Sequence, residues 1–220
     1  MDYDDSASVV EPETYITRNV SWFFKGTKWN WKYSISKSMA FKYSNEMKRN
    51  SPANNQEYLD FLSSIIDLDN PILKDISNGL ASAAKDEGYD YYETVGFFAS
   101  FVQGVITYEY DSKQFNCLDY IQYPIELLVN SKGDCEDKAT LLANLLAIQK
   151  YDLQLIDLEP SPDSGHIALA VNCAKSYPGY RYYIDGKDYC YLESTMSGWT
   201  LGGIPKKYED ISVYAKQVPN

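Results

Sequence analysis

The chain has 220 residues, of which 45% are hydrophobic and 23% are charged, and these fractions are ordinary for a folded globular domain. They exclude intrinsic disorder, collagen-like repeats and low-complexity fibre for the bulk of the chain. The formal net charge of -11 disfavours nucleic acid and anionic membrane surfaces as main partners, because binding to phosphate groups requires clustered Lys and Arg.

Targeting signals are not recognisable in the sequence. No apolar run reaches the roughly 18 residues that a membrane span needs, so we expect a soluble domain. The chain opens on the acidic segment Met1–Asp5 rather than on the basic and apolar residues of a signal peptide. A fragment of a longer secreted or anchored protein would look the same. A cytoplasmic and an extracytoplasmic location therefore both remain open, as does the oligomeric state.

The chain has one histidine, His166, which excludes sites built from several histidines. The chain has four cysteines, at Cys117, Cys135, Cys173 and Cys190. None are in C-x-x-C spacing, which excludes the usual thiol-redox and structural zinc motifs. Cys173 and Cys190 lie in or next to predicted strands and can form a disulfide if those strands pair. Reduced, buried cysteines are the alternative that the sequence favours.

Residues 1–90 are predicted to form an N-terminal extension, made of an acidic tail, an aromatic hairpin and helices. Between residues 15 and 35, two runs rich in aromatic and β-branched side chains flank Lys25–Thr27, which predicts a β-hairpin. Alternation with a period of two places Trp29 and Trp31 on one face. We expect this face to pack against the main domain, with binding of a ligand as the less favoured alternative.

Two helices are predicted between residues 70 and 107. Asn70-Pro71 begins the first, because proline suits the first turn of a helix. Its apolar stripe consists of Ile72, Leu73, Ile76, Leu80 and Ala84. The second helix spans about residues 93–107. Residues 91–220 are predicted to form the core of the protein.

The segment Gly133–Ala139 reads G-D-C-E-D-K-A and precedes an almost entirely apolar run. Asp134 suits an N-cap position and Asp137 would complete a capping box, so Cys135 would be the first residue of a buried central helix. A helix N-terminus favours the nucleophilic thiolate and offers free N–H groups to an oxyanion. The three acids beside the thiol, which include Glu136, oppose ionisation, so a histidinium partner is needed. The alternative is a small, buried structural cysteine.

Strands follow this helix. Residues 151–158 alternate between apolar and polar, and His166 opens a second strand after a loop. Asp185-Gly186 predicts a hairpin turn, which makes Asp185 a turn residue rather than a catalytic acid. Glu193 ends the second arm of that hairpin. If this arm lies beside the strand of His166, the carboxylate can orient the imidazole; otherwise Glu193 is expected at the rim, in water. Helices followed by strands indicate an α+β fold.

These segments together resemble the transglutaminase-like superfamily. The match consists of Gly133–Ala139, His166–Val171 and Tyr191–Thr195, which read like the G-D-C-E-D, H-x-A-x-x-V and L-E-x-T motifs of its archaeal and bacterial branch. The resemblance implies a papain-like core, in which a Cys-bearing central helix packs on an antiparallel sheet. It also implies a catalytic triad of Cys135, His166 and Glu193. It is good over about residues 95–205 and poor over the first 90 residues.

The resemblance implies thiol-dependent acyl transfer on a protein or peptide amide through a thioester, and we favour hydrolysis, as in a cysteine peptidase, over transfer to an amine. Gln103 or Tyr108 is a candidate second donor to the oxyanion, with packing on a helix face as the alternative. Two departures from better-studied members are Ala168, where an aromatic residue is common, and Glu193, where Asp is usual. Both bear on the substrate groove rather than on acyl transfer itself.

A G-D-C-E-D string also occurs in bacterial calcium-dependent cysteine proteases. It makes Asp134, Glu136 and Asp137 weak candidates for calcium ligands, although helix capping explains these acids more simply. No other metal and no organic cofactor is expected. The alternative to an enzyme is a non-catalytic binding or structural module of a larger envelope protein with the same fold.

Overall fold

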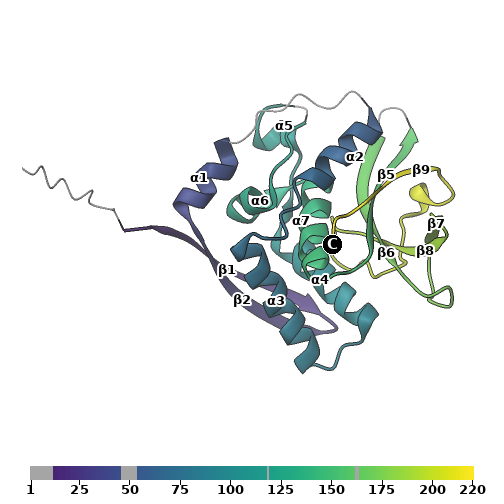
Figure 1. Cartoon of the computed structure of the whole chain (residues 1–220), viewed down its shortest axis with the longest axis horizontal. Coiled ribbons are helices and arrows are strands. Elements are labelled where there is room, and N and C mark those ends of the chain that lie inside the picture. The colour runs from purple at the N-terminus through teal and green to yellow at the C-terminus, as the bar shows by residue number, and fades with distance from the viewer. Residues whose placement is uncertain (1–11, 46–53, 118, 162–163) are drawn as a thin grey trace, which may run out of the picture.

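A computed structural model describes residues 12–45, 54–117, 119–161 and 164–220, so the predicted acidic tail lies almost wholly outside the described residues. The central helix α7 (Cys135–Ile148) has helices on one side and a five-stranded antiparallel sheet on the other (Figure 1). The fold is therefore α+β with a Cys-bearing central helix, as predicted.

The helical part and the N-terminal strands occupy the first two thirds of the chain. Their elements are β1 (Tyr15–Phe24), β2 (Thr27–Ser36), α1 (Lys37–Asn45), α2 (Asn55–Ser64), α3 (Pro71–Asp86), α4 (Tyr91–Val105), β3 (Thr107–Tyr108), α5 (Asp111–Gln114), α6 (Pro124–Asn130) and β4 (Lys132–Gly133). Strands β3 and β4 form a short parallel pair that brings the end of α4 to the residues before Cys135.

The predicted aromatic hairpin is confirmed. Strands β1 and β2 pair along their whole length, and Lys25 and Gly26 form the turn with φ angles of 51° and 81°. Such angles favour glycine, which occupies the second turn position. Trp22 is 2% exposed and lies 5.1 Å, ring centroid to centroid, from Phe101 of α4. The aromatic face therefore packs against the main domain.

Helices α3 and α4 agree with the predicted pair. The side chain of Asn70 accepts hydrogen bonds from the backbone N–H groups of Ile72 and Leu73, with Pro71 in the first turn. The apolar stripe of α3 faces the core, which also contains residues of the hairpin, α4, α7 and the sheet. One buried cluster thus extends across residue 90, and the division of the chain there stays a prediction.

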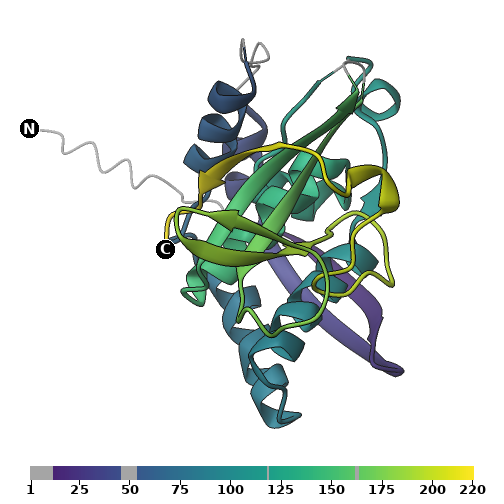
Figure 2. The same cartoon turned by 90° about the vertical axis from the view of Figure 1, so that its right-hand side faces the viewer.

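The sheet has the strand order β7-β8-β6-β5-β9 and faces the viewer in Figure 2. Its strands are β5 (Leu153–Ser161), β6 (Ser164–Asn172), β7 (Arg181–Ile184), β8 (Lys187–Leu192) and β9 (Val213–Gln217), with a short 3-10 helix at Lys206–Tyr208. Asp185 and Gly186 form the predicted hairpin turn, with φ angles of 48° and 83°. Strand β9 was not predicted.

Strands β6 and β8 are neighbours, with Leu169 opposite Leu192, as the proposed contact between His166 and Glu193 requires. A disulfide joins Cys173 and Cys190 next to this pairing, while Cys117 and Cys135 are free. The expectation of reduced cysteines throughout is therefore wrong. It failed because the strand register, which brings the two sulfur atoms together, cannot be obtained from spacing alone. Among the described residues, no helix has both the length and the apolar character of a membrane span.

Candidate active site

Cys135 is the first residue of α7, as predicted. The first four peptide N–H groups of any helix have no intrahelical acceptor, and the N–H of Cys135 is one of these four. Gly133 allows the close approach of the preceding segment, because a Cβ there would meet Asp137 Oδ2 at 2.5 Å and Leu127 Cδ1 at 2.6 Å. The thiol therefore lies at the positive end of a buried helix.

The predicted capping box at this helix is wrong. Asp134 occupies the N-cap position, but its side chain makes no capping hydrogen bond. Asp137 accepts instead from the backbone N–H of Gln122 at 2.7 Å and from its Nε2 at 2.6 Å. A partner distant in sequence has replaced the local acceptor, so capping does not explain these acids.

His166 is the third residue of β6, rather than the first residue of its strand, and only 7% of it is exposed. Its Nε2 lies 3.1 Å from Glu193 Oε2, and its ring is close enough to Cys135 for an interaction with the thiol to raise the pKa of His166. The thiol itself donates a hydrogen bond to Glu136 Oε2 at 3.3 Å. With Nε2 directed at Glu193, Nδ1 is the nitrogen that remains for the thiol. The structure thus brings Cys135, His166 and Glu193 together.

Glu193 follows β8 directly and is 2% exposed. Its Oε1 accepts from the N–H groups of Ser194 and Thr195, both at 2.9 Å, and from Thr195 Oγ1 at 2.8 Å. Its Oε2 accepts from the hydroxyl of Tyr191 at 2.7 Å, in addition to its contact with His166. Both oxygens of this buried carboxylate are fully hydrogen-bonded, which is what a buried anion requires.

The electrostatics favour an ion pair between His166 and Glu193. Burial by itself lowers the pKa of His166, but hydrogen bonds to Cys135 and Glu193 outweigh it and raise the pKa from 6.5 to about 9. Burial by itself raises the pKa of Glu193, but the hydrogen bond to His166 and its charge lower the pKa from 4.5 to about 2. Imidazolium and carboxylate therefore coexist at neutral pH.

A cluster of acids lies on the other side of the thiol, around the start of α7. It comprises Asp111, Asp119, Asp134, Glu136 and Asp137, and two overlapping sets of three place one oxygen from each member within 4.8 Å of the others. Burial, and then the charge of neighbours, raises the pKa of Asp111 to about 7 and those of Glu136 and Asp137 well above their usual range. The Oδ1 atoms of Asp111 and Asp134 are buried without a hydrogen-bond partner.

The two candidate oxyanion donors differ in their surroundings. Gln103 Nε2 donates to the carbonyl oxygens of Glu193 at 2.7 Å and Trp199 at 3.3 Å, so its amide nitrogen is already engaged. Tyr108 lies at the short β3 strand, close enough to Cys135 for charge on the thiol to affect it. The pKa of the Tyr108 hydroxyl is raised, mainly by burial and next by charge on Cys135. Of the two residues, Tyr108 is therefore the better candidate.

Two residues at this site were missed. The ring of Tyr208 stacks on the imidazole of His166, with centroids 4.8 Å apart and planes at 5°. Lys138 is fully buried one turn after Cys135. A lysine within an apolar helical run was the available signal for Lys138, whereas Tyr208 lies in a region without recognisable pattern.

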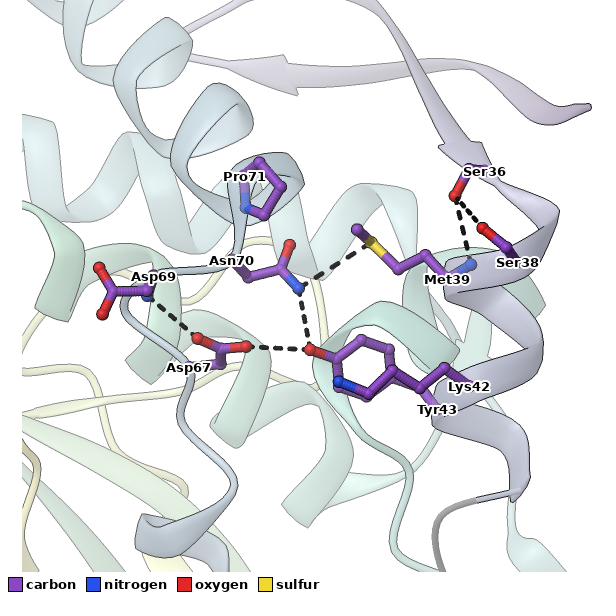
Figure 3. Close-up of a pocket in the computed structure, with 9 residues that line it drawn as sticks. All are labelled: Ser36, Ser38, Met39, Lys42, Tyr43, Asp67, Asp69, Asn70 and Pro71. Atoms are coloured by element: carbon purple, nitrogen blue, oxygen red, sulfur yellow. Dashed lines mark hydrogen bonds between the residues drawn. The ribbon is translucent and has the colours of Figure 1, made fainter. Parts of the chain in front are cut away.

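Two cavities lie away from the thiol. One, of about 520 Å³, lies between α1 and the start of α3 (Figure 3). In this cavity the hydroxyl of Tyr43 donates to Asp67 Oδ2 at 2.9 Å and accepts from Asn70 Nδ2 at 3.0 Å. Because Asn70 is the N-cap of α3, this network stabilises the start of that helix. The other, of about 500 Å³, lies between β1, α4 and residues 197–200 and includes Gln103.

The family model described as "Transglutaminase-like domain" matches residues 26–214. The chain belongs to this family. The match confirms the resemblance to the transglutaminase-like superfamily. It also includes residues 26–90, most of the segment predicted as an N-terminal extension. No curated protein matches the chain.

Two solved structures are similar to this transglutaminase-like domain. One is the crystal structure of a TGase, with a TM-score of 0.40 and 13% identity over 88% of this chain, which spans 47% of the TGase chain. The other is a candidate cysteine protease from Cytophaga hutchinsonii, with a TM-score of 0.36 and 13% identity over 94% of this chain and 76% of that protein. At these scores the likeness carries no conclusion about activity.

Proposed function

We propose that the protein is a thiol enzyme that transfers the acyl group of a peptide or Gln side-chain amide to water through a Cys135 thioester. The observation that carries the proposal is the position of His166, which interacts on one side with the thiol of Cys135 and lies on the other side 3.1 Å from the buried carboxylate of Glu193. Nucleophile, base and orienting acid are thus in contact in the order that general-base activation of a nucleophile requires.

In the first half-reaction, the thiolate sulfur of Cys135 attacks the amide carbon while His166 holds the proton. The oxyanion accepts a hydrogen bond from the backbone N–H of Cys135, and the hydroxyl of Tyr108 is the proposed second donor. As the C–N bond breaks, His166 Nδ1 gives its proton to the leaving amine and a thioester remains. Glu193 keeps the imidazole in the orientation that serves both transfers.

In the second half-reaction, water attacks the thioester carbon and gives a proton to His166. The C–S bond breaks, the carboxylic acid leaves, and His166 returns its proton to the sulfur of Cys135, which regenerates the thiol. An amine in place of water would give a cross-linked product by the same steps. We favour water, because hydrolysis needs no dedicated amine site.

The test is the rate of Cys135 alkylation by iodoacetamide at pH 6, followed by mass spectrometry of the Cys135 peptide. We expect a His166→Ala variant to react about 100-fold more slowly than the wild type, because the base that takes the proton of the thiol is lost. Cys117, also a free thiol, serves as an internal comparison in the same digest. Equal rates at Cys135 in both proteins would contradict the proposal and favour a non-catalytic binding module.

We further propose that the acid cluster binds a divalent cation, calcium being the first choice. Carboxylates are the ligands that such hard cations prefer. The unpartnered Oδ1 of Asp111, in a side chain only 3% exposed, fits this role, and so does that of Asp134. Asp119, Glu136 and Asp137 would complete the set; bound there, a cation would neutralise like charges beside the thiol.

Calorimetric titration of calcium into EDTA-treated protein tests this second proposal. We expect saturable binding and an increase in unfolding free energy of about 2.7 kcal/mol at a calcium concentration 100 times the Kd. Asp111→Asn should abolish both effects, whereas Asp86→Asn, at an exposed position on α3, should preserve them. Absence of heat and of any thermal shift at millimolar calcium would refute the cation site.

A further inference from the structure

Lys138 carries a charge that the proposed mechanism does not use. It lies one turn after Cys135 on α7, and 0% of it is exposed. Lysine is almost never fully buried unless its ammonium group has partners. Its Nζ donates to the carbonyl oxygen of Ile106 at 2.6 Å and to that of Thr195 at 2.8 Å. These two acceptors belong to segments on either side of the central helix.

The contact with Thr195 leads directly to the catalytic acid. Thr195 donates from its backbone N–H at 2.9 Å and its Oγ1 at 2.8 Å to Oε1 of Glu193, whose Oε2 contacts His166 Nε2 at 3.1 Å. A continuous series of hydrogen bonds therefore runs from Lys138 to His166. It begins on the helix that carries the thiol of Cys135.

We propose that Lys138 is a positioning residue that fixes the turn carrying Glu193 to the helix carrying Cys135, so that His166 is held between them. Its consequence for catalysis rests on the proposed function. An ammonium group suits this role because it donates several hydrogen bonds from one atom, here to two separate carbonyl groups. An apolar side chain of similar length would leave both carbonyl oxygens buried and unpaired, which loosens the turn.

The pKa of His166, measured by NMR, tests the proposal, because the only histidine of the chain gives an unambiguous signal. In Lys138→Met we expect the turn to move away and the contact between Glu193 and His166 to weaken. The pKa of His166 should then fall toward 6.5 from its raised value of about 9. Alkylation of Cys135 at pH 6 should slow about tenfold, as expected for coupled neighbours.

The direction of the shift separates positioning from other roles. If Lys138 acted only through space, loss of its positive charge would raise the pKa of the nearby imidazolium. If it only stabilised the fold, the pKa of His166 in the folded variant would not change. A rise or no change therefore overturns the proposal. Lys85→Met, at an exposed position on α3, controls for the loss of a lysine and should leave the pKa of His166 unchanged.

A milder variant covers a failure of Lys138→Met to fold. Lys138→Gln keeps an amide donor at the same buried position, and we expect a smaller fall in the pKa of His166. The titration requires no turnover, so it distinguishes the two proposals. Equal alkylation of Cys135 at pH 6 in the wild type and in His166→Ala would refute the proposed function. The effect of Lys138 on the pKa of His166 is decided separately, by the titration.

Discussion

Glu193 and Glu136 are both buried, at 2% and 5% exposure, yet their pKa values move in opposite directions. Glu136 accepts a hydrogen bond from the thiol of Cys135, whereas Glu193 contacts His166. Burial raises the pKa of each carboxyl group. At Glu193 the hydrogen bond to His166 and its charge outweigh burial, and Tyr191 and the turn of Thr195 supply further donors. At Glu136 the charge on Cys135, and then the neighbouring aspartates, act in the same direction as burial.

The comparison shows that donors and neighbouring charge, rather than depth, decide which buried carboxyl group is ionised. On the sheet side of the thiol, where His166 and Glu193 lie, the ionised carboxylate of Glu193 stabilises the positive charge on His166. The helix side, around the start of α7, holds carboxyl groups that bind protons or require a cation. The thiol of Cys135 therefore lies between a compensated ion pair, His166 with Glu193, and a cluster of acids whose negative charges repel one another.

The largest expected effect comes from exchanging each glutamate for its neutral isostere. Glu193→Gln removes the anion beside His166, so we expect Cys135 alkylation at pH 6 to slow about 100-fold. Stability should fall by about 3 kcal/mol, since breaking a buried pair leaves an uncompensated group. Rates come from mass spectrometry and stabilities from urea unfolding.

Glu136→Gln is the matched control, measured in EDTA so that no cation is bound. The amide mimics a protonated carboxyl group, so alkylation and stability should change little. Equal losses in the two variants would contradict the opposite charge states on which the comparison rests.

The pH dependence of stability sharpens the comparison. The raised pKa of His166 means that its contribution is complete below about 6.5 and is lost as pH rises through about 9. The lowered pKa of Glu193 means that its contribution is complete above about 4.5 and is lost as pH falls through about 2. We expect the wild type to exceed Glu193→Gln in unfolding free energy by about 3 kcal/mol near pH 5.5, and the difference to fade above pH 9. A difference that grew between pH 7 and 10 would refute the ion pair.

The disulfide also stabilises the sheet, because it joins the end of β6, at the opposite end from His166, to β8, the strand that Glu193 follows. We expect two reactive thiols when the unreduced protein is denatured, from Cys117 and Cys135, and one in Cys117→Ser. Reduction should lower the unfolding free energy by about 3 kcal/mol, as expected for a loop of this size. Four thiols in the unreduced protein would exclude the bridge.

The sequence predicts the parts of this site that depend on local patterns. The motif around Cys135, the strand of His166 and the turn at Asp185-Gly186 each follow from a few adjacent residues, and each lies where the pattern indicates. The position of Glu193 beside His166 needed one further assumption, that β6 and β8 pair. A single register then brings the two side chains together.

What the sequence did not reveal depends on contacts between distant segments. The capping box failed because Gln122 provides donors to Asp137 that no local rule anticipates. Asp111 and Asp119 lie outside the recognised motif and join the acid cluster only through the path of the chain after β3. The aromatic cover on His166 comes from Tyr208, far along the sequence, in a segment that forms no long element.

Tyr208 gives the smallest expected effect. It is 5% exposed and stacks on His166, while the ammonium group of Lys207 lies 4.5 Å from the centre of its ring. Tyr208→Leu should open the contact between His166 and Glu193 to water, which weakens their attraction because solvent screens it. We expect the pKa of His166 to move toward 6.5 and alkylation of Cys135 at pH 6 to slow about fivefold, the effect of roughly 1 kcal/mol of stacking.

Tyr208→Phe is the control for this variant, because it keeps the stacked ring and removes only the hydroxyl group. The pKa of His166 and the alkylation rate should then match the wild type. If Phe and Leu had the same effect, the hydroxyl rather than the stacked ring would matter. The stack itself would then contribute nothing to the charge on the sheet side of the thiol, and that charge would depend on Glu193 and its donors alone.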